Sequence, residues 1–195
     1  MMAHVARVHA VARLPYVAPD AASPPVREVL EALPPLNIFR TVAHAETAMR
    51  PLLRLGGAIL GDGELDPRRR ELAILRVAAV TGAEYEWVQH AAIARGVGVS
   101  DEQIAAVERG ELDADCLDED DRLVLHFAEE LLGDDGASEA TMALARERLS
   151  PREIVELILA VGYYRMLAGV MNSVDIDLDE PMGQAVVDSA RQRRS

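Results

Sequence analysis

Cysteine is almost absent from this chain of 195 residues, in which Cys116 is the only one. A single thiol excludes an intrachain disulfide and a multi-cysteine zinc site within one chain. It also fits a reducing compartment, because stable disulfides belong to oxidising ones. The N-terminus has no continuous apolar segment of the kind a signal peptide needs. We therefore expect a cytoplasmic protein.

Long apolar runs and excess basic charge are also lacking. No run approaches the ~20 apolar residues that a membrane span requires. The net charge is −13 and the sequence pI is about 4.8. A surface of this sign repels nucleic acid and anionic membranes, so we expect neither as a partner. The composition is compatible with a small-molecule substrate.

Aromatic residues make up only 4% of the chain, although half of the residues are hydrophobic. The apolar content is mainly Ala, Leu and Val, and alternating β-branched runs are scarce, which indicates helices. The pattern predicts an all-α, single-domain bundle of about eight helices. Residues 1–24 read as an extended N-terminal arm, because a continuous helix is excluded by Pro15, Pro19, Pro24 and Pro25. Residues 25–175 form the helical domain and residues 176–195 a C-terminal tail. The arm can cover the domain or a neighbouring subunit.

The centre of the chain is the stretch 65–97, which holds two helical patterns separated by a break at Thr81–Gly82. Asp66–Pro67 is a typical helix start, with a capping side chain followed by proline at the first helical position. The first helix, 67–80, is apolar around most of its girth, which predicts a central position. The second runs from about residue 83 to residue 95 and ends at a glycine.

Other elements frame this pair. The sequence LNIFR at 36–40 predicts a turn, and residues 41–60 predict a helix that is bent or broken at Pro51. A capping box from Ser150 to Glu153 opens a long apolar helix over 151–171.

Acidic and imidazole side chains interrupt the central apolar helices. Glu86 and His90 are four residues apart, so they lie on one helical face beside apolar neighbours. Burial raises the pKa of a carboxyl group, and a neighbouring histidine can share its proton. Antiparallel packing of the two helices brings Glu71 close to His90. This is the composition of a general acid–base site near neutral pH.

Structural explanations of the same residues stay open. A Glu/His pair at this spacing is also common as a surface pair or a satisfied buried contact. A metal site of two glutamates and one histidine is conceivable, but the ligand set is short and lacks the Glu-x-x-His spacing of di-iron bundles. We therefore expect no metal.

Other chemical motifs are weak or missing. His126 reads as a residue of a helix face, and the acidic neighbours of Cys116 would raise the pKa of its thiol and lower its reactivity. Tyr163 and Tyr164 read as packing residues of the last long helix. There is no G-x-S-x-G, P-loop or dinucleotide-binding motif.

The segment RRRELAILRVAAVTGAEYEWVQHAAIARGVGVSDEQIAAV, residues 68–107, resembles the carboxymuconolactone decarboxylase family, which includes the alkyl hydroperoxidase D-like proteins. The resemblance rests on a glutamate, a helix break, and a helix that carries a histidine. With LNIFR and GDGELDP it covers most of residues 15–110. It implies an all-helical subunit assembled as a trimer or hexamer, with sites in clefts near subunit contacts.

The hydroperoxidase-like branch carries Cys-x-x-Cys before its histidine, with glutamate and histidine as a proton relay. The resemblance places that glutamate at Glu71, the histidine at His90, and the two cysteines at Ala83 and Glu86. Both thiols are missing, and dithiol peroxidase chemistry needs one to attack and one to resolve. The "EYEW…H" form therefore looks like a non-redox branch.

Three functions follow from these observations. The first is a cofactor-independent lyase or isomerase acting on a small organic acid or lactone, with Glu71, Glu86 and His90 as catalytic residues. We expect Tyr85, Trp87 and Phe39 to wall its substrate pocket. The second is a peroxide-reducing protein that uses Cys116. The third is a non-enzymatic binding or assembly module.

Overall fold

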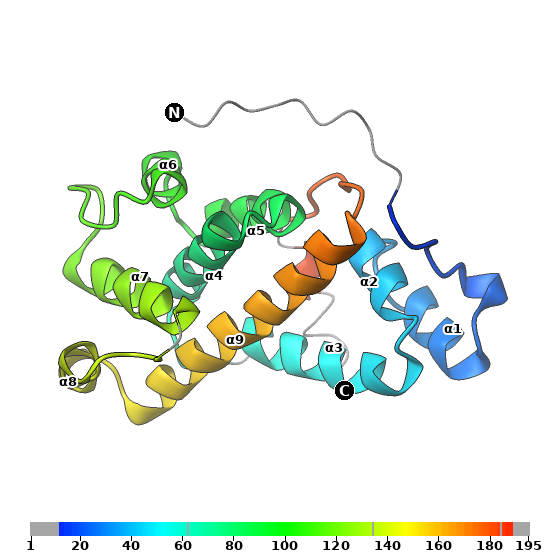
Figure 1. Cartoon of the computed structure of the whole chain (residues 1–195), viewed down its shortest axis with the longest axis horizontal. Helices are drawn as coiled ribbons and strands as arrows, with labels where there is room; N and C mark the ends of the chain where they lie inside the picture. The colour runs from blue at the N-terminus through cyan, green and yellow to red at the C-terminus, as the bar shows by residue number, and fades with distance from the viewer. Residues whose placement is uncertain (1–11, 62, 134, 184, 189–195) are drawn as a thin grey trace.

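The computed structural model describes residues 12–61, 63–133, 135–183 and 185–188. Within these ranges it contains nine α-helices, one short 3₁₀-helix and no strand, which confirms the predicted all-α fold (Figure 1). The elements are η1 (Pro19–Ala21), α1 (Pro24–Glu31), α2 (Asn37–Val42), α3 (Glu46–Gly61), α4 (Pro67–Thr81), α5 (Glu84–Gly96), α6 (Asp101–Arg109), α7 (Glu119–Leu132), α8 (Glu139–Arg148) and α9 (Pro151–Val174).

Helix α4 is the centre of the bundle and packs against α5, α6, α7 and α9. The Asp66 side chain begins it by accepting hydrogen bonds from the backbone N–H groups of Arg68 and Arg69. Gly82, with φ of 65°, ends it in the left-handed conformation that glycine adopts without strain. Apolar residues surround most of α4 because other helices pack against it on several sides.

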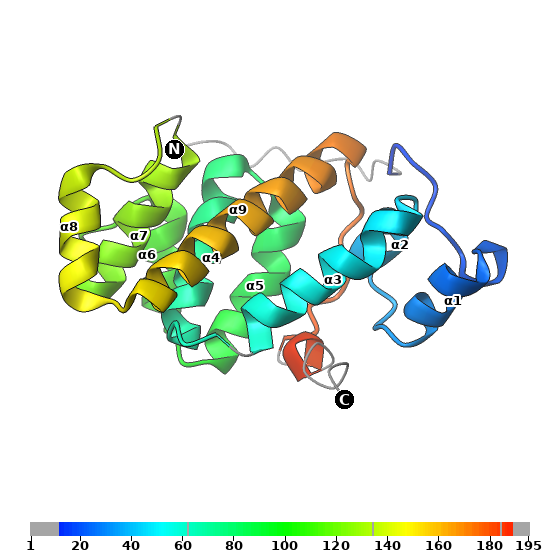
Figure 2. The ribbon, with the colours of Figure 1, turned by 90° about the horizontal axis from the view of Figure 1, so that it is seen from below.

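Helix α9 crosses the bundle diagonally over α4 (Figure 2). By length and composition it is the one helix of the described residues that could span a membrane, with half of its most apolar stretch buried inside the fold. Its apolar residues do not form one unbroken run, because Glu156 and Arg165 interrupt it, but its average hydropathy is high enough to pass this test. A core helix of a soluble protein passes the same test.

The N-terminal helices differ from the prediction. Residues 36–40 do not form a turn, because α2 begins at Asn37. The expected helix over 41–60 is divided at 43–45 rather than at Pro51, which lies inside a continuous α3. Pro51 lacks the N–H that would bond the carbonyl of Thr47. Both residues are exposed, so water can satisfy that carbonyl.

The segment after α9 packs against the N-terminal arm, α2 and α5. The Tyr16 hydroxyl donates to Asp177 at 2.9 Å, so the described part of the arm packs on the same chain. Asp179 accepts from the Tyr85 hydroxyl on α5 and from the backbone N–H of Asn37 on α2, both at 2.6 Å. The segment 175–180 thereby holds α2 against α5. Residues 1–11 of the predicted arm and 189–195 of the predicted tail lie outside the described residues.

Candidate functional site

A buried chain of hydrogen bonds connects α4 to α5. The Arg70 guanidinium donates to Glu71 Oε1 through Nε at 3.1 Å and Nη2 at 3.0 Å. His90 Nδ1 lies 2.7 Å from Glu71 Oε2. Glu71 is completely buried, and the other two residues are nearly so. The short break at Gly82 makes α4 and α5 neighbours, and this packing brings Glu71 and His90 together as predicted.

This arrangement decides which nitrogen of His90 carries hydrogen. A carboxylate can only accept hydrogen bonds, so Nδ1 must be the donor to Glu71. In the neutral ring Nε2 is then the acceptor, and it has no hydrogen-bond partner among the described residues. Glu71 therefore orients the ring and would stabilise a positive charge on it. His90 can act as a base through Nε2.

Glu86 is a buried carboxyl group without a partner. It is 2% exposed, and neither of its oxygens has a hydrogen-bond partner among the described residues. Burial raises the pKa of Glu86 well above its ordinary value, because an unpaired charge is poorly solvated there. The group is thus favoured in its neutral form, in which it can donate a proton.

Two tyrosines of α9 complete the surroundings. The ring of Tyr164 meets the His90 ring edge-to-face, with centroids 4.6 Å apart. The Tyr163 hydroxyl donates to the carbonyl of Leu52 on α3 at 3.2 Å. Burial, with a contribution from Glu86, raises the pKa of Tyr163 to about 12. Both tyrosines therefore keep their protons at neutral pH.

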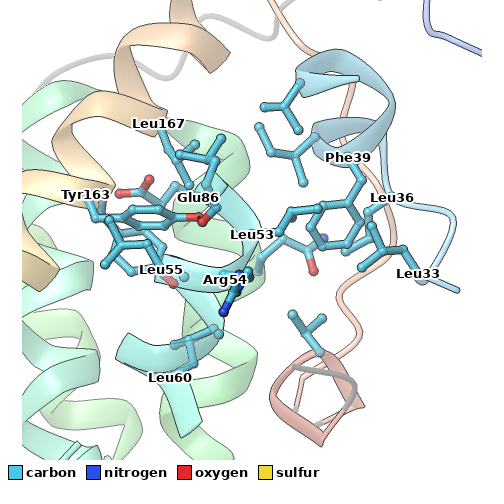
Figure 3. A pocket seen from close by; sticks show the side chains of 18 of the residues that line it. Leu33, Leu36, Phe39, Leu53, Arg54, Leu55, Leu60, Glu86, Tyr163 and Leu167 are labelled. Atoms are coloured by element: carbon cyan, nitrogen blue, oxygen red, sulfur yellow. The ribbon is translucent and has the colours of Figure 1, made fainter. Parts of the chain in front are cut away.

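Glu86, His90 and both tyrosines line a pocket of about 1090 Å³ between α1–α3 on one side and α5 and α9 on the other. Figure 3 shows Glu86 and Tyr163 together at one end of this pocket. Leu33, Leu36 and Phe39 lie at the other end, and Leu53 and Arg54 lie between the two groups. Most of the lining is aliphatic or aromatic, as is usual for ligand pockets.

The predicted pocket walls are only partly brought together. Phe39 and Tyr85 line the pocket, and burial with the neighbouring Asp179 raises the pKa of Tyr85. Trp87 does not line it and packs instead on a separate apolar cluster that includes Leu72 and Leu75. Tyr85 and Trp87 lie about 100° from Glu86 around α5 in opposite directions, and only the side of Tyr85 faces the pocket.

Several site residues were missed or misread from the sequence. Arg70 belongs to a run of three arginines and was not singled out from the sequence, yet it is buried against Glu71. Tyr163 and Tyr164 were predicted as packing residues, and they also face the pocket. Gln89 lines the pocket, and its side-chain amide donates to the backbone carbonyl of Asp179 at 3.1 Å. The sequence offered one sign that α9 contributes to the site, which is the pair of adjacent tyrosines in an otherwise aliphatic helix.

Metal and thiol chemistry have little support in this geometry. Across the part of the chain that the structure describes, no three His, Cys, Asp or Glu residues are grouped to hold a metal ion. Cys116 is partly buried before α7 and packs on the cluster that contains Trp87. It does not line the pocket.

Comparisons with known proteins agree with this description. Residues 46–130 match the Carboxymuconolactone decarboxylase family. No curated protein matches the chain. A solved structure from Ralstonia eutropha JMP134, described as an alkylhydroperoxidase AhpD core and an uncharacterized peroxidase-related protein, is similar with a TM-score of 0.76 and 21% identity. The similarity covers 94% of this chain and 98% of that one.

Two further structures share the fold. An uncharacterized peroxidase-related protein from Silicibacter sp. TM1040 has a TM-score of 0.66 at 18% identity, over 73% of this chain and 76% of its own. A protein of unknown function from Agrobacterium tumefaciens has a TM-score of 0.65 at 18% identity, over 71% of this chain and 94% of its own. Residues 46–130 thus match the carboxymuconolactone decarboxylase family, and the chain has an AhpD-like fold.

Proposed function

We propose that this protein is a cofactor-independent lyase or isomerase that acts on an organic acid or lactone by proton transfer. The observation that carries the proposal is the pair of complementary groups in one pocket. Glu86 holds a proton because it is buried and unpaired. His90 presents Nε2 as a basic nitrogen because its Nδ1 is bound to Glu71. A proton donor and a proton acceptor that share one pocket suit acid–base catalysis.

The chemistry follows from these two roles. In an isomerisation, His90 Nε2 takes a proton from carbon beside a carbonyl or carboxyl group, and Glu86 donates its proton to the substrate. Glu71 then stabilises the imidazolium. In a decarboxylation, the electron pair of the broken carbon–carbon bond stays on the substrate as an enolate-like carbanion, and Glu86 protonates it. Arg70 is a positioning residue in both cases, because the hydrogen bonds of its guanidinium go to Glu71 and it does not line the pocket.

Substitution of the two acting groups tests the proposal. Glu86→Gln and His90→Ala each remove one proton-transfer group and are expected to lower kcat by a factor of about 10² to 10⁴. The matched control is Glu84→Gln, which makes the same change at an exposed position of the same helix. Circular dichroism and sedimentation should show unchanged helicity and oligomer size. Wild-type rates in both pocket variants would refute the assignment.

The descriptions of two structural neighbours as peroxidase-related favour a second candidate, peroxide reduction. In this chain it would depend on Cys116, which lies outside the pocket and has no second thiol to resolve it. Peroxide consumption that is lost in Cys116→Ser would support this candidate. Consumption that survives the substitution would remove it.

A further inference from the structure

Arg54 is the one charged side chain of the pocket that has no counter-charge. It lies on α3 and lines the pocket, and among the described residues it makes no ion pair or hydrogen bond. The other arginine of the lining, Arg50, donates to Glu28 at 2.5 Å. His90 is bound to Glu71, and burial favours the neutral form of Glu86. The pocket therefore carries one uncompensated positive charge.

That charge has the opposite sign to the rest of the molecule. The chain as a whole has a net charge of −13. Arg54 is exposed, so its guanidinium stays solvated in the absence of a ligand, and it can bind a carboxylate by two parallel charge-assisted hydrogen bonds. One anionic group per ligand matches the one free cation.

The size and lining of the pocket define the remainder of the ligand. Its volume of about 1090 Å³ slightly exceeds the range of about 300–1,000 Å³ that is usual for ligand pockets. The end away from Glu86 is walled by Leu33, Leu36 and Phe39 (Figure 3). A small polar acid would leave this end unfilled and would bury none of its apolar surface.

We propose that the ligand is an organic monoanion with an extended apolar body, and that Arg54 binds its carboxylate. The apolar body extends towards Leu33, Leu36 and Phe39. The carboxylate end of the ligand is then the end nearer to Glu86, which lies in the same pocket on the other side of Arg54 (Figure 3). This inference rests on the proposed function, because it takes Glu86 and His90 as the reacting end.

Three simple ligands separate the contributions of charge and apolar length. Octanoate has both features, octan-1-ol has the length without the charge, and butanoate has the charge without the length. Each is titrated against the full chain loaded with N-phenyl-1-naphthylamine, a neutral fluorescent probe of apolar pockets. Octanoate is expected to displace the probe with an apparent affinity at least tenfold higher than that of octan-1-ol or of butanoate.

The variant Arg54→Gln tests the role of the arginine. It should lower the affinity for octanoate about tenfold and leave that for octan-1-ol unchanged. The matched control, Arg95→Gln, removes the same charge from an exposed position of α5 outside the pocket and should change neither affinity. The inference is overturned if wild-type protein binds octanoate and octan-1-ol equally, if butanoate binds as well as octanoate, or if Arg54→Gln keeps the preference.

Turnover distinguishes this inference from the proposed function. Glu86→Gln should still bind octanoate with the wild-type preference, because the amide keeps the shape of the pocket and Arg54 remains. Arg54-dependent binding without any Glu86-dependent turnover of acids would refute the proposed function and keep the ligand class. Glu86-dependent turnover of substrates that bind independently of Arg54 would refute the inferred ligand class and keep the proposed function.

Discussion

At the scale of single residues, Glu86 and Glu71 show how environment divides the roles of two glutamates. Both are buried and both lie close to the same pocket. Glu71 receives hydrogen bonds from Arg70 and His90, and each of its oxygens has a partner. Glu86 has none, so burial acts on it without compensation. Hydrogen bonds therefore compensate the burial of Glu71, whereas Glu86 is favoured as a neutral acid.

The raised pKa of Glu86 makes the stability of the protein depend on pH. Above about 4.3, the ordinary pKa of a glutamate, the unfolded chain releases this proton and the folded chain keeps it. The free energy of unfolding then falls by up to about 1.4 kcal/mol per pH unit, until Glu86 ionises in the folded state. The contribution is complete at low pH and is lost as the pH rises.

Urea unfolding of wild type and Glu86→Gln at several pH values between 4.5 and 8 measures this effect. The wild type should lose stability relative to the variant as the pH rises, because an amide does not titrate. Glu84→Gln, at an exposed position, should run parallel to wild type. A constant difference between wild type and Glu86→Gln over the whole range would contradict the inferred protonation state.

At the scale of helices, the pocket depends on how closely α3 approaches α9. Gly56 permits this approach, because a Cβ built there would lie 2.4 Å from the Tyr163 hydroxyl oxygen and 2.9 Å from the ring carbon that bears it. The same hydroxyl donates to the carbonyl of Leu52, one turn earlier on α3. Glycine and tyrosine thus define the distance between the two helices that form opposite walls.

The variant Gly56→Ala should destabilise the protein by about 1–3 kcal/mol, as overpacking of a close contact generally does. The gain in helix propensity from alanine, about 1 kcal/mol, offsets part of this cost. In a Tyr163→Phe background the cost should be smaller, since the closest contact is gone. A double-mutant cycle by chemical denaturation measures the coupling, and strictly additive costs would show that the two residues do not meet.

At the scale of the whole molecule, α9 presents an apolar face to solvent on the single chain. Val155, Ile158, Leu159 and Met166 are exposed and lie at spacings that place them on one side of the helix. Exposed apolar surface of this kind is typical of an interface. The resemblance to the family implied a homo-oligomer, and we propose that this face of α9 forms its contact.

Leu159→Glu should shift the protein towards the monomer, because a carboxylate in an apolar interface is costly to desolvate. Sedimentation velocity measures the change. Leu144→Glu is the matched control, since Leu144 on α8 is exposed to a similar extent, 43% against 47% for Leu159, and lies outside this face. A wild-type protein that sediments as a monomer, or a variant with the wild-type oligomer size, would refute the proposed interface.

The sequence by itself determined the helices of the centre and the pairing of their polar residues. Asp66–Pro67 and Gly82 determine where α4 begins and ends by local capping, which needs no distant partner. The i, i+4 spacing placed Glu86 and His90 on one face, and the short break made α4 and α5 neighbours. The meeting of Glu71 with His90 followed from these local rules.

Only the tertiary structure decided what surrounds that pair. The sides of the pocket come from α2, α3 and α9, which are separated along the chain from α5, so no local pattern relates Phe39, Arg54 or Tyr163 to Glu86. The pairing of Arg70 and the lack of any partner for Glu86 are likewise results of packing. Capping and periodicity act within about one helical turn, whereas burial and charge compensation depend on contacts across the whole fold.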